Sequence, residues 1–293
     1  MKQMKQTERG ILSAYDFKRT STKIGYTIMV LMLVGMAFTM LYPIAVTMLN
    51  GFKTNAEVNS FPPKFLPTTW EFGNFTKGWN YIDLVVFLKN TLLIFIGNMV
   101  VTIFVLGLAS YSLSRLRVPY QRYIQFFFMV TLFIPAASYM IPSFVNLKEL
   151  GLLNSYAAFW LPAGANAFYL LLLKSFFDGV HMELLEAARM DGASEVGTFV
   201  RIALPLSIPI FATLAIFVFS TAWNDWFWPS LIMHSEDKYP LATAMYKYVI
   251  NVRRLDTNIK FAILFMVMVP PIIVFLVFQK YIMRGLHLGG VKG

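Results

Sequence analysis

Few residues of this chain have the type and spacing that chemistry requires. Its 293 residues include no Cys, which excludes disulfides, thiolate metal sites and thiol catalysis. The three histidines, His181, His234 and His287, are far apart in the sequence, so a histidine-rich metal site is not predicted. The phosphate-binding pattern G-x-x-x-x-G-K-S/T is absent. We therefore expect no catalytic site, no metal site and no cofactor in this chain itself.

The most informative polar stretch is 180–205. Apolar residues recur at three-residue steps from Met182 to Ala188, which predicts a short amphipathic helix. Gly192 suits the left-handed conformation that ends a helix, and Ser194 suits the cap of a second short helix. Such a helix–turn–helix either docks in a groove of a partner protein or lies among lipid headgroups. The pattern alone leaves both alternatives open.

A second polar group is formed by Trp223, Asn224, Asp225 and Trp226. One interpretation is an aromatic belt at the membrane surface, where indole rings are enriched. The other is the mouth of a substrate path, in which indoles stack on sugar rings and the two polar side chains bind hydroxyl groups. The first needs no ligand and is the simpler of the two.

The elements that position these residues are membrane spans. Hydrophobic residues make up 57% of the chain and charged residues 14%, with a mean hydropathy of +0.60. Soluble domains have about 45–50% apolar and about 25% charged residues, so the excess points to burial in lipid. The fold class predicted is an all-α polytopic membrane protein with six transmembrane helices. The apolar runs are 24–49, 84–113, 123–145, 156–177, 204–231 and 261–283.

The distribution of cations predicts the orientation. With the N-terminus inside, the inner segments carry 15 of the 25 Lys and Arg residues. This excess indicates that both termini are cytoplasmic. The strongest single indication of this orientation is the short inner turn that contains Arg115, Arg117 and Arg122. The net charge of +10 is therefore mainly a topology signal facing membrane lipid, and nucleic-acid binding is not predicted.

The predicted organisation has three parts: a cytoplasmic N-terminal segment 1–23, a six-span transmembrane domain 24–283 that includes the turn 180–205, and a cytoplasmic tail 284–293. The first apolar run follows charged sequence and lacks a cleavage site, so we expect it to remain as a span. Acidic residues lie outside the spans, apart from Asp225. Asp225 is about 20 residues after Leu204, hence about 30 Å along a helix and near the outer interface. An ion-coupled carrier, which needs ionisable groups within the membrane, is disfavoured.

The turn resembles the EAA loop of ABC importer permeases. Glu186-Ala187-Ala188 is followed after three residues by Gly192, and Ile202-Ala203-Leu204-Pro205 comes nine residues later. Further segments resemble the maltose-type, MalG-like carbohydrate branch of that family. They are 61–68 (FPPKFLPT), 90–92 (NTL), 109–115 (ASYSLSR), 151–154 (GLLN), 223–226 (WNDW) and 285–293 (GLHLGGVKG).

The resemblance implies an ABC importer type I permease fold and a coupling helix that docks on an ATP-binding subunit. The docking residues would be Glu186, Ala187, Ala188, Asp191, Gly192, Ile202, Leu204 and Pro205. Many family members have Pro at the position of His181, and its loss here should affect only how the helix begins.

The resemblance also implies the partners and the location. These are a second permease subunit, a dimer of the ATP-binding subunit that holds ATP and Mg²⁺, and an extracytoplasmic sugar-binding protein, all at the bacterial inner membrane. The function expected is import of a carbohydrate, most simply an oligosaccharide. Three alternatives stay open: a related permease for a non-sugar solute, an ion-coupled secondary carrier, and a membrane scaffold.

Overall fold

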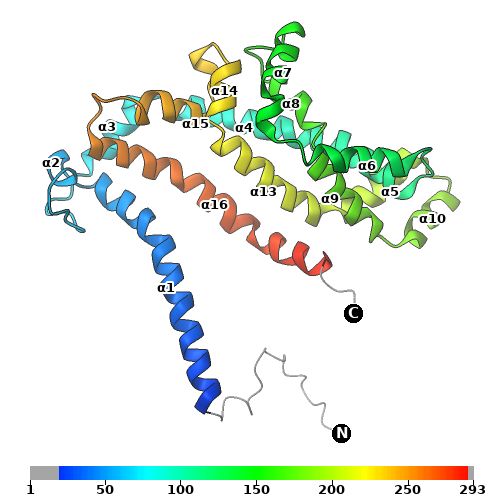
Figure 1. The fold of residues 1–293 in the computed structure, drawn as a ribbon, viewed down its shortest axis with the longest axis horizontal. Coiled ribbons are helices and arrows are strands. Elements are labelled where there is room, and N and C mark those ends of the chain that lie inside the picture. The colour runs from blue at the N-terminus through cyan, green and yellow to red at the C-terminus, as the bar shows by residue number, and fades with distance from the viewer. Residues whose placement is uncertain (1–19, 290–293) are drawn as a thin grey trace. The chain divides into compact units, whose positions relative to one another are not determined.

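The computed structural model describes residues 20–289, and these fold into helices without a strand (Figure 1). The elements are α1 (Thr20–Gly51), α2 (Asn55–Val58), α3 (Gly73–Tyr81), α4 (Leu84–Val101), η2 (Thr102–Leu106), α5 (Gly107–Arg115), α6 (Gln121–Thr131), α7 (Ala136–Glu149), α8 (Ala157–Ala163), α9 (Ala167–Asp178), α10 (Met182–Met190), α11 (Glu195–Thr198), η3 (Phe199–Ala203), α12 (Leu204–Leu206), α13 (Ile208–Asn224), α14 (Phe227–Ile232), η4 (Glu236–Lys238), α15 (Leu241–Ala244), η5 (Met245–Ile250) and α16 (Thr257–Gly289).

The chain divides into two compact units. Unit 1 contains residues up to 78 and 256–266, and unit 2 contains 79–255 together with the chain from 267 onward. Each unit is described by itself. The predicted N-terminal segment 1–23 lies mostly outside the described residues. In the predicted tail 284–293, helix α16 continues to Gly289 and the last four residues lie outside the described part.

Three helices are long and apolar enough to cross a membrane: Thr20–Gly51, the continuous helix Leu84–Arg115 formed by α4, η2 and α5, and Thr257–Val277 within α16. Three further pairs, α6 with α7, α8 with α9, and the helix Glu195–Leu206 with α13, pass the same test together. They are bent by 104°, 46° and 75°. The count is therefore up to six if each bent pair is one span, which agrees with the six predicted runs.

The three bends have a common physical cause in proline. Pro135 precedes the first residue of α7, Pro162 lies in the last turn of α8, and Pro209 lies in the first turn of α13. Proline has no N–H and its ring clashes with the preceding turn, so a helix bends or ends there. The sequence locates these prolines, but the angles follow from packing.

The fifth predicted run, 204–231, differs from the observed helices. Helix α13 begins only at Ile208 and ends at Asn224, where Asp225 adopts an extended backbone with ψ of 102°. The Asp225 carboxylate Oδ1 then accepts a hydrogen bond from the N–H of Trp228 at 3.1 Å, at the start of the separate helix α14. The polar residues 223–226 therefore form a break between two helices rather than the last turns of one.

Unit 1 is held by side-chain amides. Asn74 Nδ2 donates to the carbonyl oxygens of Gly51 at 3.0 Å and Lys53 at 2.9 Å. Asn258, at the start of α16, donates to the same Lys53 carbonyl at 3.1 Å. A Cβ added at Gly51 would lie 3.1 Å from the Cα of Ala262, so the two backbones approach closely there. These contacts join the end of α1 to the beginning of α16.

A buried hydrophobic cluster of unit 2 lies where α5, α9, α10 and η3 meet. The ring of Tyr111 packs against those of Phe177 and Phe199, with centroids 5.7 and 5.4 Å away. Leu185 of α10 and Leu214 of α13 complete this centre, and both are fully buried. The cluster attaches the predicted helix–turn–helix to the body of the unit.

Candidate functional site

The helix–turn–helix predicted at 180–205 is present. Helix α10 ends at Met190, and Gly192 has φ of +81°, the left-handed region that glycine adopts without steric cost. The N–H groups of Gly192 and Ala193 donate to the carbonyls of Arg189 and Ala188, both at 3.0 Å, and so close the helix end. Ser194 Oγ accepts from the N–H of Gly197 at 3.1 Å at the start of α11. Both predictions of local structure, at Gly192 and at Ser194, are confirmed.

One face of the turn is buried in this chain. Leu185 of α10 and Phe199 and Ala203 of η3 have no exposed surface, and Ala188 is only 8% exposed. The structure therefore places Ala188 on the inner face of α10. Its small side chain serves the close packing of α10 on this chain.

The opposite face is exposed and carries the other residues of the predicted motif in α10 and the turn. Glu186, Ala187, Asp191 and Gly192 are all exposed. The ion pairs found within the described residues, Lys174–Asp178 and Arg189–Glu195, involve neither Glu186 nor Asp191. This face therefore offers carboxylates that the described chain does not neutralise.

Large apolar side chains of the same turn are exposed. Met190 is 87% exposed, Val196 63% and Leu184 47%. A surface that combines such side chains with free carboxylates is typical of an interaction site.

The remaining predicted docking residues lie at the end of the second helix. Pro205 is exposed, whereas Ile202 and Leu204 are half-buried and pack against the core cluster of unit 2. The structure thus separates the predicted set into an outer group that a partner can reach and an inner group that holds the turn.

The two helices of the turn are linked by an ion pair. Arg189 Nε and Nη2 donate to the two carboxylate oxygens of Glu195 at 2.9 and 3.2 Å. This bidentate hydrogen bonding raises the pKa of the Arg189 guanidinium above its ordinary value. The pair and the cap at Ser194 thus link the end of α10 to the start of α11.

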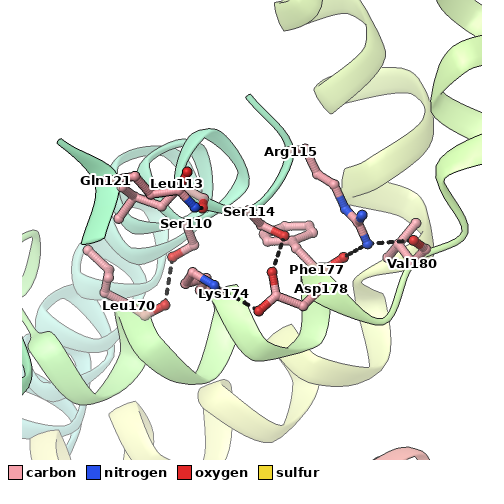
Figure 2. A network of polar contacts seen from close by, with 10 residues as sticks. All are labelled: Ser110, Leu113, Ser114, Arg115, Gln121, Leu170, Lys174, Phe177, Asp178 and Val180. Atoms are coloured by element: carbon pink, nitrogen blue, oxygen red, sulfur yellow. Dashed lines mark hydrogen bonds and ion pairs between the residues drawn. The ribbon is translucent and has the colours of Figure 1, made fainter. Parts of the chain in front are cut away.

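The base of the turn is a polar network between α5 and α9 that the sequence did not predict (Figure 2). Ser110 Oγ donates to the carbonyl of Leu170 at 2.9 Å, and Ser114 Oγ donates to Asp178 Oδ1 at 2.6 Å. Asp178 Oδ2 pairs with Lys174 at 2.8 Å. Arg115 Nη2 donates to the backbone carbonyls of Phe177 and Val180. In the sequence, Arg115 carried an orientation signal and belonged to the family-like segment 109–115, and neither indicated these contacts.

The residues Trp223 to Trp226, predicted as a belt or a substrate path, do not share one surface. Trp223 is 8% exposed and stacks on Phe219 with centroids 5.1 Å apart. Asn224 donates to the carbonyl of Ser220, and Trp226, 39% exposed, stacks on Tyr246 with centroids 4.0 Å apart. Within the described chain, Trp223 is buried in the core, whereas Asn224 at the end of α13 and Trp226 before α14 are exposed.

A second network, also unpredicted, holds the loop 232–241. Asn154 Oδ1 accepts from the N–H groups of His234 and Ser235 at 3.1 and 3.0 Å. Asn90 Nδ2 donates to the carbonyls of Asp237 and Tyr239 at 2.7 and 3.0 Å. In the sequence, Asn90 and Asn154 belonged to the family-like segments 90–92 and 151–154, and this resemblance does not reveal that Asn90 has a partner 149 positions away.

Among the described residues, no group of three or more His, Asp or Glu side chains could hold a metal ion. The site that these residues do form is a surface on a helical membrane protein: a rigid, partly apolar turn that projects from a polar base. Its exposed carboxylates and apolar side chains suit contact with another protein.

Comparison with known proteins defines the class. Residues 103–287 match the family described as the binding-protein-dependent transport system inner membrane component. This range includes the turn and most of unit 2. The chain belongs to this family and is a membrane-embedded permease component of an ABC transporter.

Individual relatives agree with this assignment. The chain is 31% identical to the polygalacturonan/rhamnogalacturonan transport system permease protein YtcP of Bacillus subtilis (strain 168), over 83% of this chain and 89% of that protein. It is 30% identical to the arabinooligosaccharides transport system permease protein AraQ of Halalkalibacterium halodurans, over 88% of this chain and 93% of that protein.

A solved structure matches almost the whole fold. It is a chain of a bacterial ABC transporter involved in the import of the acidic polysaccharide alginate, with a TM-score of 0.80 and 26% identity. The match covers 93% of this chain and 99% of that chain. The predicted family and the all-α polytopic fold class are thereby confirmed.

Proposed function

We propose that the chain is the permease subunit of an ATP-driven importer that moves a carbohydrate, most simply an oligosaccharide, into the cytoplasm. Two kinds of observation support this proposal. The two relatives described above are named for the transport of polygalacturonan/rhamnogalacturonan and of arabinooligosaccharides, and the solved structure is of a transporter involved in the import of alginate. The chain also presents an exposed turn of the kind that a coupled subunit requires.

The observation that carries the proposal is the turn around Gly192. Its buried face is fixed to the core of unit 2, and its outer face exposes Met190, Glu186 and Asp191 without partners among the described residues. An apolar anchor beside carboxylates fits a protein groove with a basic rim. Headgroups of anionic lipid would repel the two carboxylates, so a protein partner is favoured over the membrane surface.

The partners follow from this assignment. The turn docks on one subunit of an ATP-binding dimer, which holds ATP and Mg²⁺. A second permease subunit completes the translocation path, and an extracytoplasmic binding protein delivers the sugar. The exposed part of the motif, from Glu186 to Gly192, makes the contact, while Ala188, Ile202 and Leu204 support it from within. With the turn facing the ATPase, both termini lie in the cytoplasm.

The mechanism is coupling between two sites. Closure of the ATP-binding dimer draws the docked turns of the two permeases together, and the helices attached to each turn rotate and open the path outward. Hydrolysis of ATP reverses the movement, and the sugar is released inside. Trp226 and Asn224, at the break between α13 and α14, remain candidates for lining the path.

Purification from the native membrane tests the assignment. The tagged chain should bring down an ATP-binding subunit and a second permease in mild detergent. In proteoliposomes, the complex with its binding protein should hydrolyse ATP faster when the correct saccharide is added, and a panel of neutral and acidic oligosaccharides identifies it. A chain that purifies without an ATP-binding subunit contradicts the proposal. Uptake that is abolished by an uncoupler, with no ATP requirement, would instead identify an ion-coupled carrier.

A further inference from the structure

The joint between α9 and α10 is the point at which any movement of the turn must enter the rest of the chain. Helix α9 ends at Asp178 and α10 begins at Met182, so only Gly179, Val180 and His181 connect them. The N-cap residue of α10, His181, makes no side-chain hydrogen bond to the helix. Helix α10 therefore lacks the local cap that usually fixes the direction of the first turn.

A side chain from another helix supplies the missing constraint. Arg115, the last residue of α5, donates from Nη2 to the carbonyls of Phe177 and Val180, one on each side of Gly179 (Figure 2). Its Nη1 lies 4.0 Å from the sulfur of Met182, the first residue of α10. Carbonyls at a helix end carry partial negative charge, and the planar guanidinium can hold two of them in a fixed direction.

The same two helices are fixed to each other below the joint. Ser110 and Ser114 of α5 donate to the Leu170 carbonyl and the Asp178 carboxylate of α9 (Figure 2). The joint keeps two backbone hydrogen bonds, from the N–H groups of Gly179 and Val180 to the carbonyls of Phe176 and Phe177, both at 3.0 Å. Among the side-chain hydrogen bonds found in the described residues, those of Arg115 alone link the joint to α5. Loss of Arg115 leaves the α5–α9 pair and the aromatic core in place but removes this side-chain link.

We propose that Arg115 is the positioning residue that couples the docking turn to the α5–α9 pair. When the ATP-binding subunit displaces α10, the guanidinium passes the displacement through the Phe177 and Val180 carbonyls to α5, which is continuous with the long helix Leu84–Arg115. Without it, the joint swivels and the displacement is lost. This inference rests on the proposed function of the turn.

The test compares substrate transport with ATP hydrolysis in the same proteoliposomes that contain the whole transporter. The variant Arg115→Gln removes the positively charged guanidinium. Arg115→Lys keeps the positive charge but lacks the planar guanidinium that can hold both carbonyls. Arg117→Gln is the matched control, because Arg117 lies two residues further, is exposed and has no described partner. We expect Arg115→Gln to hydrolyse ATP but to transport about tenfold less substrate per ATP, a loss of the size expected when charge-assisted hydrogen bonds are removed. Arg115→Lys should fall between, and Arg117→Gln should match the unmodified chain.

Two results would overturn the proposal. One is a normal ratio of transport to hydrolysis in Arg115→Gln. The other is a proportional loss of both activities, which would mark Arg115 as a contributor to folding or docking only. If Arg115→Gln does not assemble, Arg115→Lys decides in its place, and a normal ratio in that variant also counts against the proposal. Failure of the proposed function is distinguishable, since the unmodified chain would then show no ATP-dependent uptake at all.

Discussion

The docking turn and the loop 232–241 are both held by side chains of the continuous helix Leu84–Arg115, but in different ways. Arg115 at the end of that helix holds the base of the turn, and Asn90 near its beginning holds the loop. The 25 residues between them correspond to about 38 Å of helix, roughly the thickness of a membrane with its interfaces. The two networks therefore lie near opposite ends of one helix that is long and apolar enough to cross a membrane.

The two networks differ in the side chains that they leave exposed and without a partner in the described chain. At the loop, neutral amides of Asn90 and Asn154 bond the backbone of residues 234–239, so that the segment is satisfied by its own chain. At the turn, only the base is satisfied, and the projecting part keeps exposed methionine and carboxylate groups. A closed network indicates a segment that stays with the chain, and an open one indicates a surface prepared for a partner.

The strongest test of this difference uses two glycines. Gly192 in the turn and Gly151 beside the loop network both have positive φ, +81° and +67°, and both have open space around the position of a Cβ atom. Valine at either position brings a similar backbone cost of about 1–2 kcal/mol. We expect Gly192→Val to abolish uptake while the chain remains in the membrane, and Gly151→Val to keep most of it.

Radiolabelled sugar uptake and immunoblots of membranes measure both effects. Gly192→Asn is the control for backbone geometry, because asparagine tolerates the left-handed region, and it should retain transport. Equal loss in the two valine variants would show that strain, and not the docking turn, limits transport.

The next effect concerns the buried side of the turn. Phe199 has no exposed surface and packs against Tyr111 with centroids 5.4 Å apart. Phe199→Ala should lower the free energy of unfolding by about 3–5 kcal/mol, because it removes a large core side chain and leaves a cavity. The thermal midpoint of the purified complex should fall clearly. The neighbouring Val200 is 45% exposed, and Val200→Ala should change the stability by no more than about 0.5 kcal/mol. Similar shifts of the thermal midpoint in Phe199→Ala and Val200→Ala would mean that the Phe199 face is not buried.

A smaller effect is expected at the loop. Asn154→Ala removes the acceptor of the His234 and Ser235 N–H groups and should destabilise the loop by about 1–3 kcal/mol. Limited proteolysis should then cut residues 233–240 faster, with little change in ATPase binding. Asn146→Ala, at an exposed asparagine of α7, is the control and should leave the rate unchanged. Loss of the ATP-binding subunit in Asn154→Ala would contradict the separation of the two regions.

The smallest effect is expected at the Arg189–Glu195 ion pair. The Glu195 side chain is 46% exposed, and such pairs contribute about 0–1 kcal/mol and are screened by salt. Glu195→Gln should therefore move the thermal midpoint only slightly, and less in high salt than in low salt. A shift as large as that of Phe199→Ala would show that the pair, and not the core, fixes the turn.

Local signals in the sequence predicted the turn well. Gly192 and Ser194 act through bonds to residues at most five positions away, and for that reason residue type and spacing are sufficient to predict them. The six apolar runs were likewise predictable, since the length of a span follows from the thickness of the membrane.

The contacts that position the turn could not be predicted in this way. Arg115 and Val180 are 65 positions apart, and Asn90 and Tyr239 are 149 apart. No pattern in a single sequence connects such pairs. Ala188 shows the same limit on a smaller scale: the motif marks it for contact with a partner, and only the structure shows that it lies with Leu185 on the buried face of α10. The sequence shows the prolines at which the helices bend, but it does not show the bend angles.

The amide contacts of unit 1 impose an order on biosynthesis. Asn258 reaches the carbonyl of Lys53 across 205 positions of the chain, whereas Arg115 reaches Val180 across 65. At about 5–20 residues per second, roughly 10–40 s separate the synthesis of Lys53 from that of Asn258. During this interval the segment after α1 waits without its final hydrogen-bond donor. The bonds from Asn74 can form early in synthesis, but the bond that ties α16 to this segment can form only after residue 258 has been made.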